Sequence, residues 1–459
     1  MRKTGRETRR KARTTLIASI PAMLVAVAAI LAGSATIASA APESVVYTGT
    51  IRSGKQSDTP NAREWSGKDG ASGHPQMTAG AIRQAAANFR TCIEGLWPLA
   101  SRRGVSRTAF RAMTASLKPD LRIMDLLDSQ PEFTKAVWDY LDVLVNDNRV
   151  AAGQAMLEKY RTTFDAVEKV YGVDRYFIAA IWGVETNYGE IGGDRPVLRS
   201  TATLACVGRR QRYFRDEFIA ALDMLNRGDV KPDRLVGSWA GAFGPTQFMP
   251  TAFKRYAVDF DRDGRRNVLE SMPDLIASTA NNLKKNGWRP GETWGYEVVV
   301  PANFNFILAD RHRVMTMREW QQHGIARPGG KPFPRPDDRA FMLVPAGVQG
   351  PGFLMLPNFR AIMRYNPAEA YALAIGHLAD RLRGGGPFAQ GWPRYERVLT
   401  RDERLELQQL LERHGFDVGE PDGRLGAKTR RALRNFQAAT GRVPDGFASS
   451  GLLKTLRDR

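Results

Sequence analysis

The chain has 459 residues, 43% of them hydrophobic, so it is long enough for two or three domains with sizeable cores. Its formal net charge is +19, with 67 Lys and Arg against 48 Asp and Glu, which suits an anionic partner such as nucleic acid, a membrane surface or an acidic cell-wall polymer. No DNA- or RNA-binding motif accompanies the charge, so a nucleic-acid partner is not expected. The two cysteines, Cys92 and Cys206, form neither a CxxC motif nor a Cys/His cluster, which argues against a zinc site.

The first 40 residues have the pattern of an export signal. Seven Lys and Arg lie in residues 1–13, an uncharged apolar run follows at 16–33, and Ala38-Ser39-Ala40 suits cleavage after Ala40. The apolar run is long for a signal peptide, so an N-terminal membrane anchor that is not cleaved is the alternative. Export would bring the chain into an oxidising compartment, where Cys92 and Cys206 can form a disulfide; two buried free thiols are the other possibility.

A linker and a helical region follow the signal. Residues 41–78 are rich in Ser, Gly, Pro, Thr and Lys, which predicts a flexible linker. From about residue 79 to residue 236, apolar residues recur at three- and four-residue spacing, which predicts helices. The segment 194–212 is expected to connect two of these helices.

One helix of this region carries a candidate for acid–base chemistry. The stretch 176–189, YFIAAIWGVETNYG, is apolar for nine residues before it reaches Glu185, with Asp174 as the expected N-cap and Gly189 as the expected stop. A carboxylate on the apolar face of a helix is costly when it is ionised and unpaired. It therefore finds a partner or stays protonated near neutral pH, as a general acid must. The alternative is a glutamate at a frayed helix end that points to water.

A loop rich in Gly and Pro follows at 238–250, with the sequence SWAGAFGPTQFMP. This composition excludes a regular helix throughout and predicts a tight loop that enters a helix at Thr251. Its polar side chains, Ser238, Thr246 and Gln247, are suited to bind sugar hydroxyls. A packed glycine turn without a binding role explains the pattern equally well.

An acidic loop at 259–270, DFDRDGRRNVLE, has the spacing of an EF-hand calcium loop. Carboxylates occupy loop positions 1, 3 and 5, Gly264 occupies position 6 and Glu270 occupies position 12. Hard oxygen ligands at this spacing can wrap around a hard cation, and the glycine permits the sharp turn. The loop therefore predicts a structural calcium or sodium ion, with a solvated acidic turn as the alternative.

The second half of the chain contains the predicted β structure. Strands are expected at 295–301, 339–344 and 352–356, after a helix at 276–288. Helix returns at 358–383 and is interrupted near Asn366-Pro367, because a proline disfavours helical backbone in the residue before it.

The last part of the chain predicts a separate small unit. A connection rich in Gly and Pro covers 384–393, and a linker is expected at 389–395. Residues 396–459 predict two helices around a small apolar core.

Several motifs together resemble one enzyme family. GVETNYG, GRRQRYF, SWAGAFGPTQFMP, AVDFDRDG and RYNPAEAYALA occur between Val173 and Tyr371 in the order of the lytic murein transglycosylase B family. PDGRLGAKTRRALRNFQ, near the C-terminus, resembles a small helical peptidoglycan-binding domain. The resemblance implies a mainly α (α+β) fold, with a lysozyme-like catalytic domain at 79–388 that contains a small β element and an EF-hand-like loop. A peptidoglycan-binding domain would occupy 396–459.

The resemblance also implies roles for individual residues. Glu185 matches the catalytic glutamate of the family. The candidate substrate-binding residues are Ser238, Gln247, Arg209, Arg210, Tyr365, Asn366 and Tyr371. The acidic loop matches an EF-hand-like metal site, in which either Glu270 or Asp274 closes the loop. The candidate metal-site residues are Asp259, Asp261, Asp263, Arg265, Glu270 and Asp274.

The number of catalytic carboxylates separates the possible reactions. Ordinary glycosidases use two, but Glu190 and Asp194, which lie beyond the helix stop, match no catalytic position of the family. The resemblance implies that Glu185 alone acts as general acid and then as general base. The product would be 1,6-anhydromuramic acid, formed when the β-1,4 bond between N-acetylmuramic acid and N-acetylglucosamine is cleaved without water. A lysozyme-type muramidase and a catalytically silent peptidoglycan-binding scaffold are the alternatives.

The expected partners and location follow from the same resemblance. Peptidoglycan glycan strands are the expected substrate, and cell-wall synthesis or division proteins are further candidate partners. The chemistry requires no cofactor. The expected location is the periplasm, with the chain either free after cleavage near Ala40 or anchored to the inner membrane.

Overall fold

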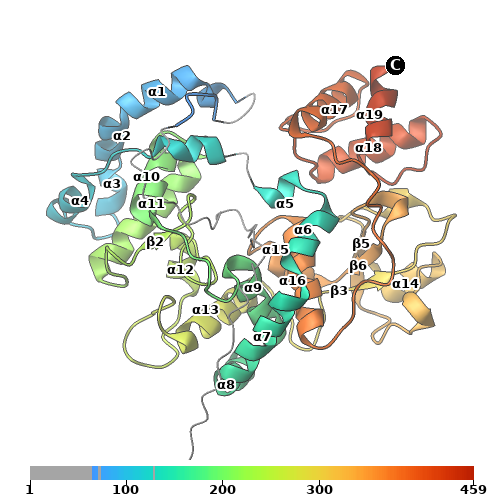
Figure 1. Ribbon diagram of the computed structural model, residues 1–459, viewed down its shortest axis with the longest axis horizontal. Helices are drawn as coiled ribbons and strands as arrows, with labels where there is room; N and C mark the ends of the chain where they lie inside the picture. The colour runs from blue at the N-terminus through green and yellow to red at the C-terminus, as the bar shows by residue number, and fades with distance from the viewer. Residues whose placement is uncertain (1–64, 71–73, 128–129) are drawn as a thin grey trace, which may run out of the picture. The chain divides into compact units, whose positions relative to one another are not determined.

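Helices make up most of the part of the chain that the structure describes, as the sequence predicts (Figure 1). The computed structural model describes residues 65–70, 74–127 and 130–459. The export signal or membrane anchor expected at 1–40 lies outside these residues. Within the described ranges, no helix has both the length and the apolar character needed to cross a membrane. The predicted fold class, mainly α with a small β element, is confirmed.

The first group of helices encloses its own hydrophobic core, which Phe110, Leu204 and Phe218 fill without exposure to solvent. The group consists of α1 (Ala79–Ala87), α2 (Phe89–Gly95), α3 (Trp97–Ser101), α4 (Arg107–Thr114), the 3-10 turn Leu121–Leu126, α10 (Val197–Cys206) and α11 (Gln211–Arg227). Segments that are far apart in the sequence therefore share one core. Burial of these apolar side chains is the main term that stabilises the arrangement.

The helix α10 lies inside the segment 194–212, for which the sequence predicts only a connection. Every residue from Ser200 to Cys206 is buried. Ser200, Thr201 and Thr203 are among these buried residues, so apolar residues alone do not mark the buried face of this helix in the sequence. The expectation of an unstructured connection is therefore wrong.

The residues before α1 are packed and not free. Met77 is fully buried, and Trp65 packs against the same core as α2 and α10. The Ser66 hydroxyl donates a hydrogen bond of 2.5 Å to Asp125, and the Ala79 N–H donates one of 2.8 Å to Asp69. The flexible linker predicted for 41–78 therefore does not extend over the described residues from 65 onward, because two large apolar side chains anchor them.

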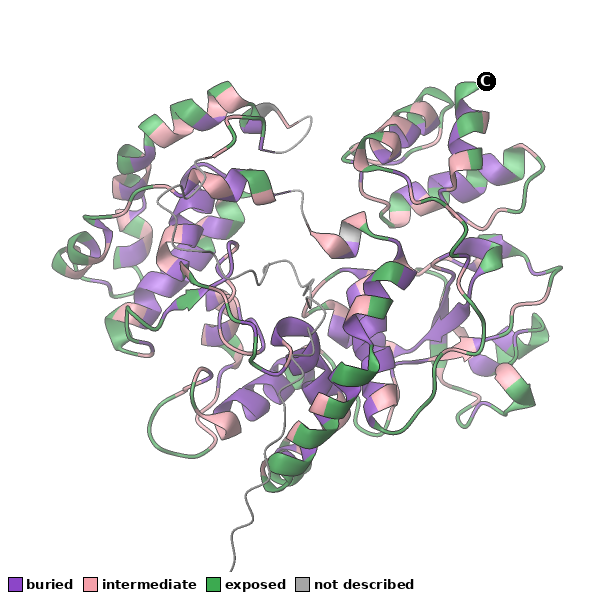
Figure 2. Cartoon of the chain, viewed as in Figure 1, coloured by how far each residue is buried: buried purple, intermediate pink, exposed green. Residues whose placement is uncertain are grey.

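A second group of helices surrounds α9 (Arg175–Thr186), which is buried from Phe177 to Thr186 (Figure 2). α16 packs against α9, and α7, α8 and α13 also contact it. The group consists of α5 (Pro131–Thr134), α6 (Val137–Leu144), α7 (Asp147–Lys159), α8 (Arg161–Tyr171), α12 (Pro250–Tyr256), α13 (Met272–Lys285), α15 (Pro357–Met363) and α16 (Glu369–Leu382). The predicted interruption between two helices near Asn366-Pro367 is confirmed.

A four-stranded antiparallel sheet forms the β element, in the order β3-β6-β5-β4. The strands are β3 (Gly295–Val298), β4 (Met315–Thr316), β5 (Arg339–Leu343) and β6 (Gly352–Met355), and α14 (Met317–Gln322) follows β4. Leu354 of β6 lies between Tyr296 of β3 and Met342 of β5. Three strands are those that the sequence predicts, each slightly shorter than expected. β4 has two residues, too few for any alternation to show. A separate pair, β1 (Arg195–Pro196) and β2 (Val236–Gly237), is also antiparallel.

The C-terminal unit contains three helices and not two: α17 (Arg401–Arg413), α18 (Ala427–Ala439) and α19 (Ser450–Arg457). Leu407, Leu433 and Leu453 lie in its core. The linker expected at 389–395 is held against the preceding domain, because the backbone N–H groups of Ala389 and Gln390 both donate to Glu297 at 2.8 Å. Trp392 also packs against Trp138, with ring centroids 6.3 Å apart.

Cys92 on α2 and Cys206 at the end of α10 form a disulfide, one of the two alternatives that the sequence leaves open. The bridge joins residues 114 positions apart. It closes a long loop in the unfolded chain and so reduces the conformational entropy gained on unfolding.

We expect the double variant Cys92→Ala/Cys206→Ala to lose about 2–5 kcal/mol of unfolding free energy, since the open chain regains that entropy. Calorimetry should show a lower Tm for the variant, and a reductant should lower the Tm of the unmodified chain in the same way. The variant itself should not respond to reductant. An unchanged Tm in the variant would contradict a stabilising role for the bridge.

Candidate active site

The end of α9 places Glu185 where the chain turns sharply. Asp174 caps the start of the helix as predicted, since its side chain accepts the Tyr176 N–H at 2.9 Å. The helix ends at Thr186, before the predicted stop at Gly189, because Asn187, Tyr188 and Gly189 all have positive φ values of 49°, 61° and 90°. Three left-handed residues in succession cannot continue a right-handed helix.

Two glycines make room for the ring of Tyr188 beside this turn. A Cβ atom at Gly183 would lie 2.6 Å from the Tyr188 ring, and one at Gly153 would lie 2.1 Å from its hydroxyl oxygen. Gly183 comes from α9 and Gly153 from α7, so both helices lack a side chain where the ring lies. This close packing fixes the turn directly after Glu185.

Glu185 is a buried carboxyl group with one tyrosine partner. Glu185 is 6% exposed. Its Oε1 accepts a hydrogen bond of 2.7 Å from the Tyr371 hydroxyl on α16. Burial raises the pKa of Glu185 to about 8, the Tyr371 hydrogen bond opposes the rise, and the negative charge of Glu132 adds to it. At neutral pH the carboxyl group is therefore mainly protonated.

Two further tyrosines lie close to this carboxyl group. Burial, and then the charge of Glu185, raises the pKa of Tyr365 above its usual value, and burial does the same for Tyr140. Tyr365 donates its hydroxyl to the carbonyl of Thr246. The hydroxyl of Tyr140 has no hydrogen-bond partner among the described residues. The tyrosines near Glu185 thus remain neutral hydrogen-bond donors over the physiological pH range.

The predicted loop at 238–250 is tied to the end of α9. The Thr186 hydroxyl, next to Glu185, donates to the carbonyl of Pro245 at 2.6 Å. Gln247 has a positive φ of 50°, and its Nε2 donates to the Gly244 carbonyl at 2.9 Å. The Gln247 Oε1 is buried and has no hydrogen-bond partner within the described ranges, so it is an available acceptor.

The structure places Ser238 at the base of this loop. Its hydroxyl oxygen accepts the Ala242 N–H at 2.9 Å, and its own N–H donates to the Ala242 carbonyl at 2.7 Å. Ser238 therefore shapes the loop, and its hydroxyl keeps a donor for another group. These hydrogen bonds describe a packed turn, and the binding of sugar hydroxyls by its polar side chains stays a prediction.

A second carboxylate that the sequence reasoning missed lies near Glu185. Glu132, on the short helix α5, is 7% exposed, and its Oε1 accepts the Asn366 Nδ2 at 3.4 Å. The Asn366 Oδ1 accepts the Ala368 N–H at 3.1 Å, so both ends of its amide are oriented. Glu190, which matches no catalytic position of the family, is exposed. No spacing pattern links Glu132 to Glu185, because only tertiary packing brings them together.

The arginine pair lies at the turn between α10 and α11. Arg209 donates to the carbonyl of Leu127 at 3.2 Å. The guanidinium of Arg210 lies over the ring of Tyr213, 4.5 Å from its centroid. These contacts place the pair on the first group of helices, whereas Glu185, Tyr371 and the other tyrosines belong to the second group.

The acidic loop brings three carboxylates together. Oxygen atoms of Asp259, Asp261 and Asp263 all lie within 4.8 Å of one another. Gly264 has a φ of 89°, the conformation for which the sequence motif requires a glycine. The Asp259 Oδ1 is buried and accepts no hydrogen bond from the described residues. Three like charges and an unused buried oxygen fit a hard cation such as calcium.

The two residues proposed to close the loop have different surroundings. Asp274 is fully buried, and its two oxygens accept the backbone N–H groups of Phe260 at 2.6 Å and Asn267 at 2.7 Å. Asp274 thereby joins both arms of the loop. Glu270 has an exposed side chain, which instead forms an ion pair with Arg234 at 2.6 Å. Glu270 does not belong to the cluster of three aspartates. Arg265 is linked to the three aspartates by its backbone N–H, which donates a hydrogen bond of 2.8 Å to Asp263.

Comparison with known proteins identifies the family. The transglycosylase SLT domain family matches residues 88–380, and the peptidoglycan binding domain family matches residues 400–456. The chain is 29% identical over 292 residues to the membrane-bound lytic murein transglycosylase B of Escherichia coli strain K12, covering 61% of this chain and 80% of that protein.

Solved structures agree with this assignment. Two structures of SltB3 from Pseudomonas aeruginosa, in complex with NAG-anhNAM-pentapeptide and with NAG-NAM-pentapeptide, are 43% identical and cover 80% of this chain and 99% of theirs, with TM-scores of 0.76 and 0.77. The Escherichia coli lytic transglycosylase Slt35 in complex with calcium is 28% identical, covers 64% of this chain and 92% of its own, and gives a TM-score of 0.55. The chain therefore belongs to the transglycosylase SLT domain family.

Proposed function

We propose that the chain is a lytic murein transglycosylase that cleaves the β-1,4 bond between N-acetylmuramic acid and N-acetylglucosamine and leaves 1,6-anhydromuramic acid ends. The observation that carries the proposal is the buried Glu185, whose pKa is raised to about 8 beside the Tyr371 hydroxyl. The SltB3 structures, with bound NAG-NAM-pentapeptide and NAG-anhNAM-pentapeptide, support it because these two ligands correspond to substrate and anhydro product.

Glu185 would act first as an acid. Its protonated carboxyl group donates a proton to the glycosidic oxygen as the bond to C1 of N-acetylmuramic acid breaks. The carbonyl oxygen of the neighbouring N-acetyl group stabilises the positive charge that develops at C1. A raised pKa suits this step, because the carboxyl group must hold its proton at neutral pH.

Glu185 would then act as a base. The carboxylate accepts the proton of the C6 hydroxyl, and the C6 oxygen attacks C1 to close the 1,6-anhydro ring. The Tyr371 hydroxyl, which donates to Glu185 at 2.7 Å, stabilises the carboxylate between the two steps. One residue thus serves both proton transfers, and no water enters the reaction.

Polar residues around Glu185 would orient the sugar. Glu132 holds the Asn366 amide by its Nδ2, which leaves the second Nδ2 proton as a donor for the N-acetyl oxygen. The free Gln247 Oε1 is an acceptor for a sugar hydroxyl or amide. Tyr365, Arg209 and Arg210 complete the proposed set of substrate contacts, together with Ser238 and Tyr371.

A lysozyme-type muramidase is the second candidate, and the presence of Glu132 is the observation that favours it. A hydrolase requires a second carboxylate to activate water or to attack C1. Glu132 is buried and its charge acts on Glu185. The products distinguish the two reactions, because hydrolysis leaves a reducing end where the transglycosylase leaves an anhydro end.

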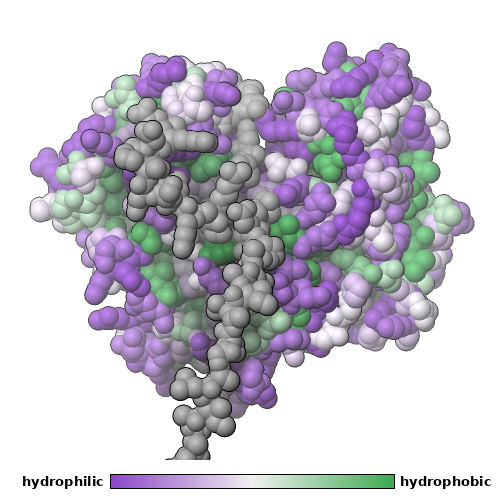
Figure 3. Space-filling view, viewed as in Figure 1, coloured by the Kyte–Doolittle hydropathy of each residue, from purple (hydrophilic) through white to green (hydrophobic). Residues whose placement is uncertain are grey.

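The C-terminal domain, the polar surface and the aspartate loop are consistent with an enzyme that acts on the cell wall. Residues 400–456 would hold the enzyme on peptidoglycan, in the periplasm, where cell-wall synthesis or division proteins are candidate partners. Figure 3 shows hydrophilic side chains over much of the visible surface of the described residues, which suits a polar polymer. The aspartate loop would bind calcium as a structural ion, as Slt35 binds calcium.

We expect Glu185→Gln to lower turnover at least about a hundredfold, since an amide cannot donate or accept the proton. Mass spectrometry of muropeptides released from purified sacculi should show anhydro products only with the unmodified chain, while sedimentation shows that the variant still binds sacculi. Glu190→Gln, which changes an exposed carboxylate five positions later, serves as the control. Release by the Glu185 variant would contradict the proposed role, and reducing products would favour the muramidase.

We expect kcat/KM to fall as pH rises through about 8, because Glu185 then loses the proton that it must donate. Tyr371→Phe removes a hydrogen bond that lowers the pKa of Glu185, so the falling limb should move to higher pH and the maximal rate should decrease. Tyr256→Phe, which removes the hydroxyl that donates to Asn286, should leave the limb in place. A limb that moves to lower pH in the Tyr371 variant would exclude this account.

We expect calcium to raise the Tm of the chain, because an ion that binds only the folded state stabilises it by about 2.7 kcal/mol at a hundred times its Kd. Asp261→Asn should abolish the response to calcium, whereas Asp139→Asn, an exposed aspartate on α6, should not. Calorimetry with calcium and with a chelator measures the difference. A Tm that is independent of calcium in the unmodified chain would contradict a structural ion in this loop.

A further inference from the structure

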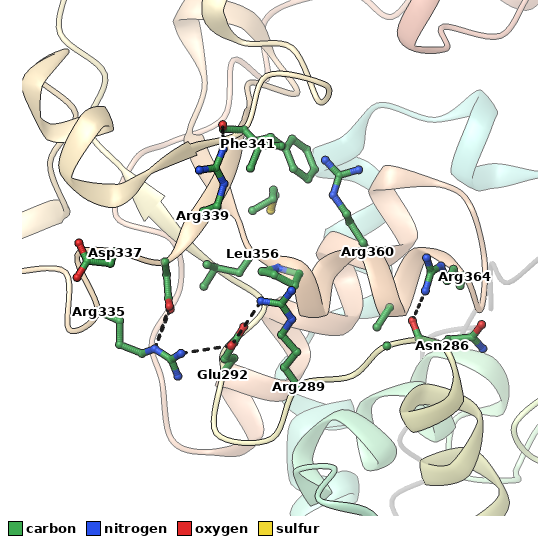
Figure 4. A pocket seen from close by; sticks show the side chains of 16 residues that line it. Asn286, Arg289, Glu292, Arg335, Asp337, Arg339, Phe341, Leu356, Arg360 and Arg364 are labelled. Carbon is green, nitrogen blue, oxygen red and sulfur yellow. Dashed lines mark hydrogen bonds and ion pairs between the residues drawn. The ribbon is translucent and has the colours of Figure 1, made fainter.

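A cavity of about 700 Å³ lies outside the site around Glu185 (Figure 4). It is formed by the segment that follows α13, the loop that precedes β5, the ends of β5 and β6, and α15. Its apolar lining includes Phe341, Met355, Leu356 and Ala361, all of which are almost completely buried. Five arginines also line it, and neither the predicted catalysis nor the metal loop uses them.

Acidic side chains at one end of the cavity are already neutralised. Arg335 pairs with Glu292 at 3.2 Å and with Asp338 at 2.9 Å, and Arg289 lies 3.7 Å from Glu292. The remaining acidic residue of the lining, Asp337, pairs at 3.2 Å with an arginine outside the cavity. This end therefore has no excess of negative charge toward a ligand.

Arg360 and Arg364, which lie across the cavity from Arg335 and Asp337, hold positive charge without carboxylate partners among the described residues (Figure 4). Arg339, Arg360 and Arg364 donate to the backbone carbonyls of Val314 at 2.9 Å, Arg311 at 2.5 Å and Asn286 at 2.6 Å. None of the three forms an ion pair with a carboxylate of the described chain. Backbone acceptors fix the guanidinium groups in place, and each keeps further N–H donors. The charge of Arg339 acts on the exposed carboxylate of Glu319, whereas the charges of Arg360 and Arg364 stay unbalanced.

The two arginines of α15 affect one another. Arg360 and Arg364 are four positions apart and therefore lie on one face of the helix. Burial, and then the positive charges of Arg311 and Arg364, lowers the pKa of Arg360. Arg360 also lies over the ring of Phe341, 4.5 Å from its centroid. A bound anion would relieve the repulsion between these cations, and a planar carboxylate fits the two parallel N–H groups of a guanidinium.

We infer that this cavity binds a carboxylate of the peptidoglycan stem peptide, held by Arg360 and Arg364 beside an apolar lining that takes aliphatic side chains. The inference rests on the proposed function, because only a peptidoglycan substrate brings such a peptide. SltB3 binds sugar ligands that carry a pentapeptide, and a pentapeptide has at least its C-terminal carboxylate.

The chain path connects this cavity with the site around Glu185. Arg364 lines the cavity, while the next residue, Tyr365, donates its hydroxyl to Thr246 in the loop beside Glu185. Asn286, which accepts from Arg364 through its carbonyl, also donates through its side chain to Asn282 on α13. A five-residue peptide can extend over about 17 Å, and a stem peptide attached to a sugar beside Glu185 would follow this segment to the cavity.

Direct binding tests the site. Isothermal titration of the full chain with a synthetic stem pentapeptide should detect binding, and the same peptide with a C-terminal amide should bind about tenfold more weakly, since a charge-assisted pair is lost. Arg360→Gln/Arg364→Gln should weaken binding of the free acid by about tenfold or more. Arg313→Gln removes a nearby exposed charge that does not line the cavity, and it should have no effect. Equal affinity for the acid and the amide would overturn the inference.

Turnover provides the second measurement. On glycan strands that carry stem peptides, Arg360→Gln/Arg364→Gln should raise KM about tenfold at unchanged kcat, and on strands stripped of peptide it should change neither. If these arginines only fix the surrounding loops, the variant would lower Tm while KM stays the same on both substrates, which would overturn the inference. Arg360→Lys/Arg364→Lys keeps the charge and provides a folded comparison if the glutamine variant does not fold. Absence of anhydro products from the unmodified chain would instead contradict the proposed function.

Discussion

The hydrogen bond between Tyr371 and Glu185, both of which are buried, is the interaction on which the site depends. Burial alone would make an ionised Glu185 very unfavourable, and the Tyr371 hydroxyl reduces this cost by stabilising the charged form. The result is a pKa of about 8, high enough to keep a proton at neutral pH and low enough to release it. A helix buried on all sides is what provides such an environment, and α9 is buried from Phe177 to Thr186.

Hydrogen bonds around Glu185 also fix the positions of the loop 238–250 and of Asn366. The Gly-rich loop would be mobile by itself, but Thr186 binds it next to Glu185 and Tyr365 binds it from the other side. Asn366 is fixed by Glu132 and by the backbone of Ala368. Residues from three distant parts of the sequence thereby hold one another in position, which is the preorganisation that the proposed proton transfer requires.

Away from the site around Glu185, buried carboxylates and arginines form hydrogen bonds with backbone groups and thereby support the fold. Asp274 is a fully buried acid, yet it accepts backbone N–H groups and so holds the metal loop together. The arginines Arg360 and Arg364 also bond to backbone, but their charge is not balanced by any carboxylate of the described chain. Charge balance, more than the number of hydrogen bonds, separates a side chain that only supports the fold from one that is suited to bind a ligand.

The sequence by itself determined the local features: the helix that carries Glu185, its cap at Asp174, the strands at 295–356 and the loop of three aspartates, because periodicity, capping and turn chemistry act over a few neighbouring residues. It also predicted the family and the possible disulfide. It missed α10, whose buried residues include Ser200, Thr201 and Thr203, and the placement of Glu132 beside Asn366. Only the tertiary structure decided these, since burial and charge around a residue depend on segments that packing, and not sequence distance, brings together.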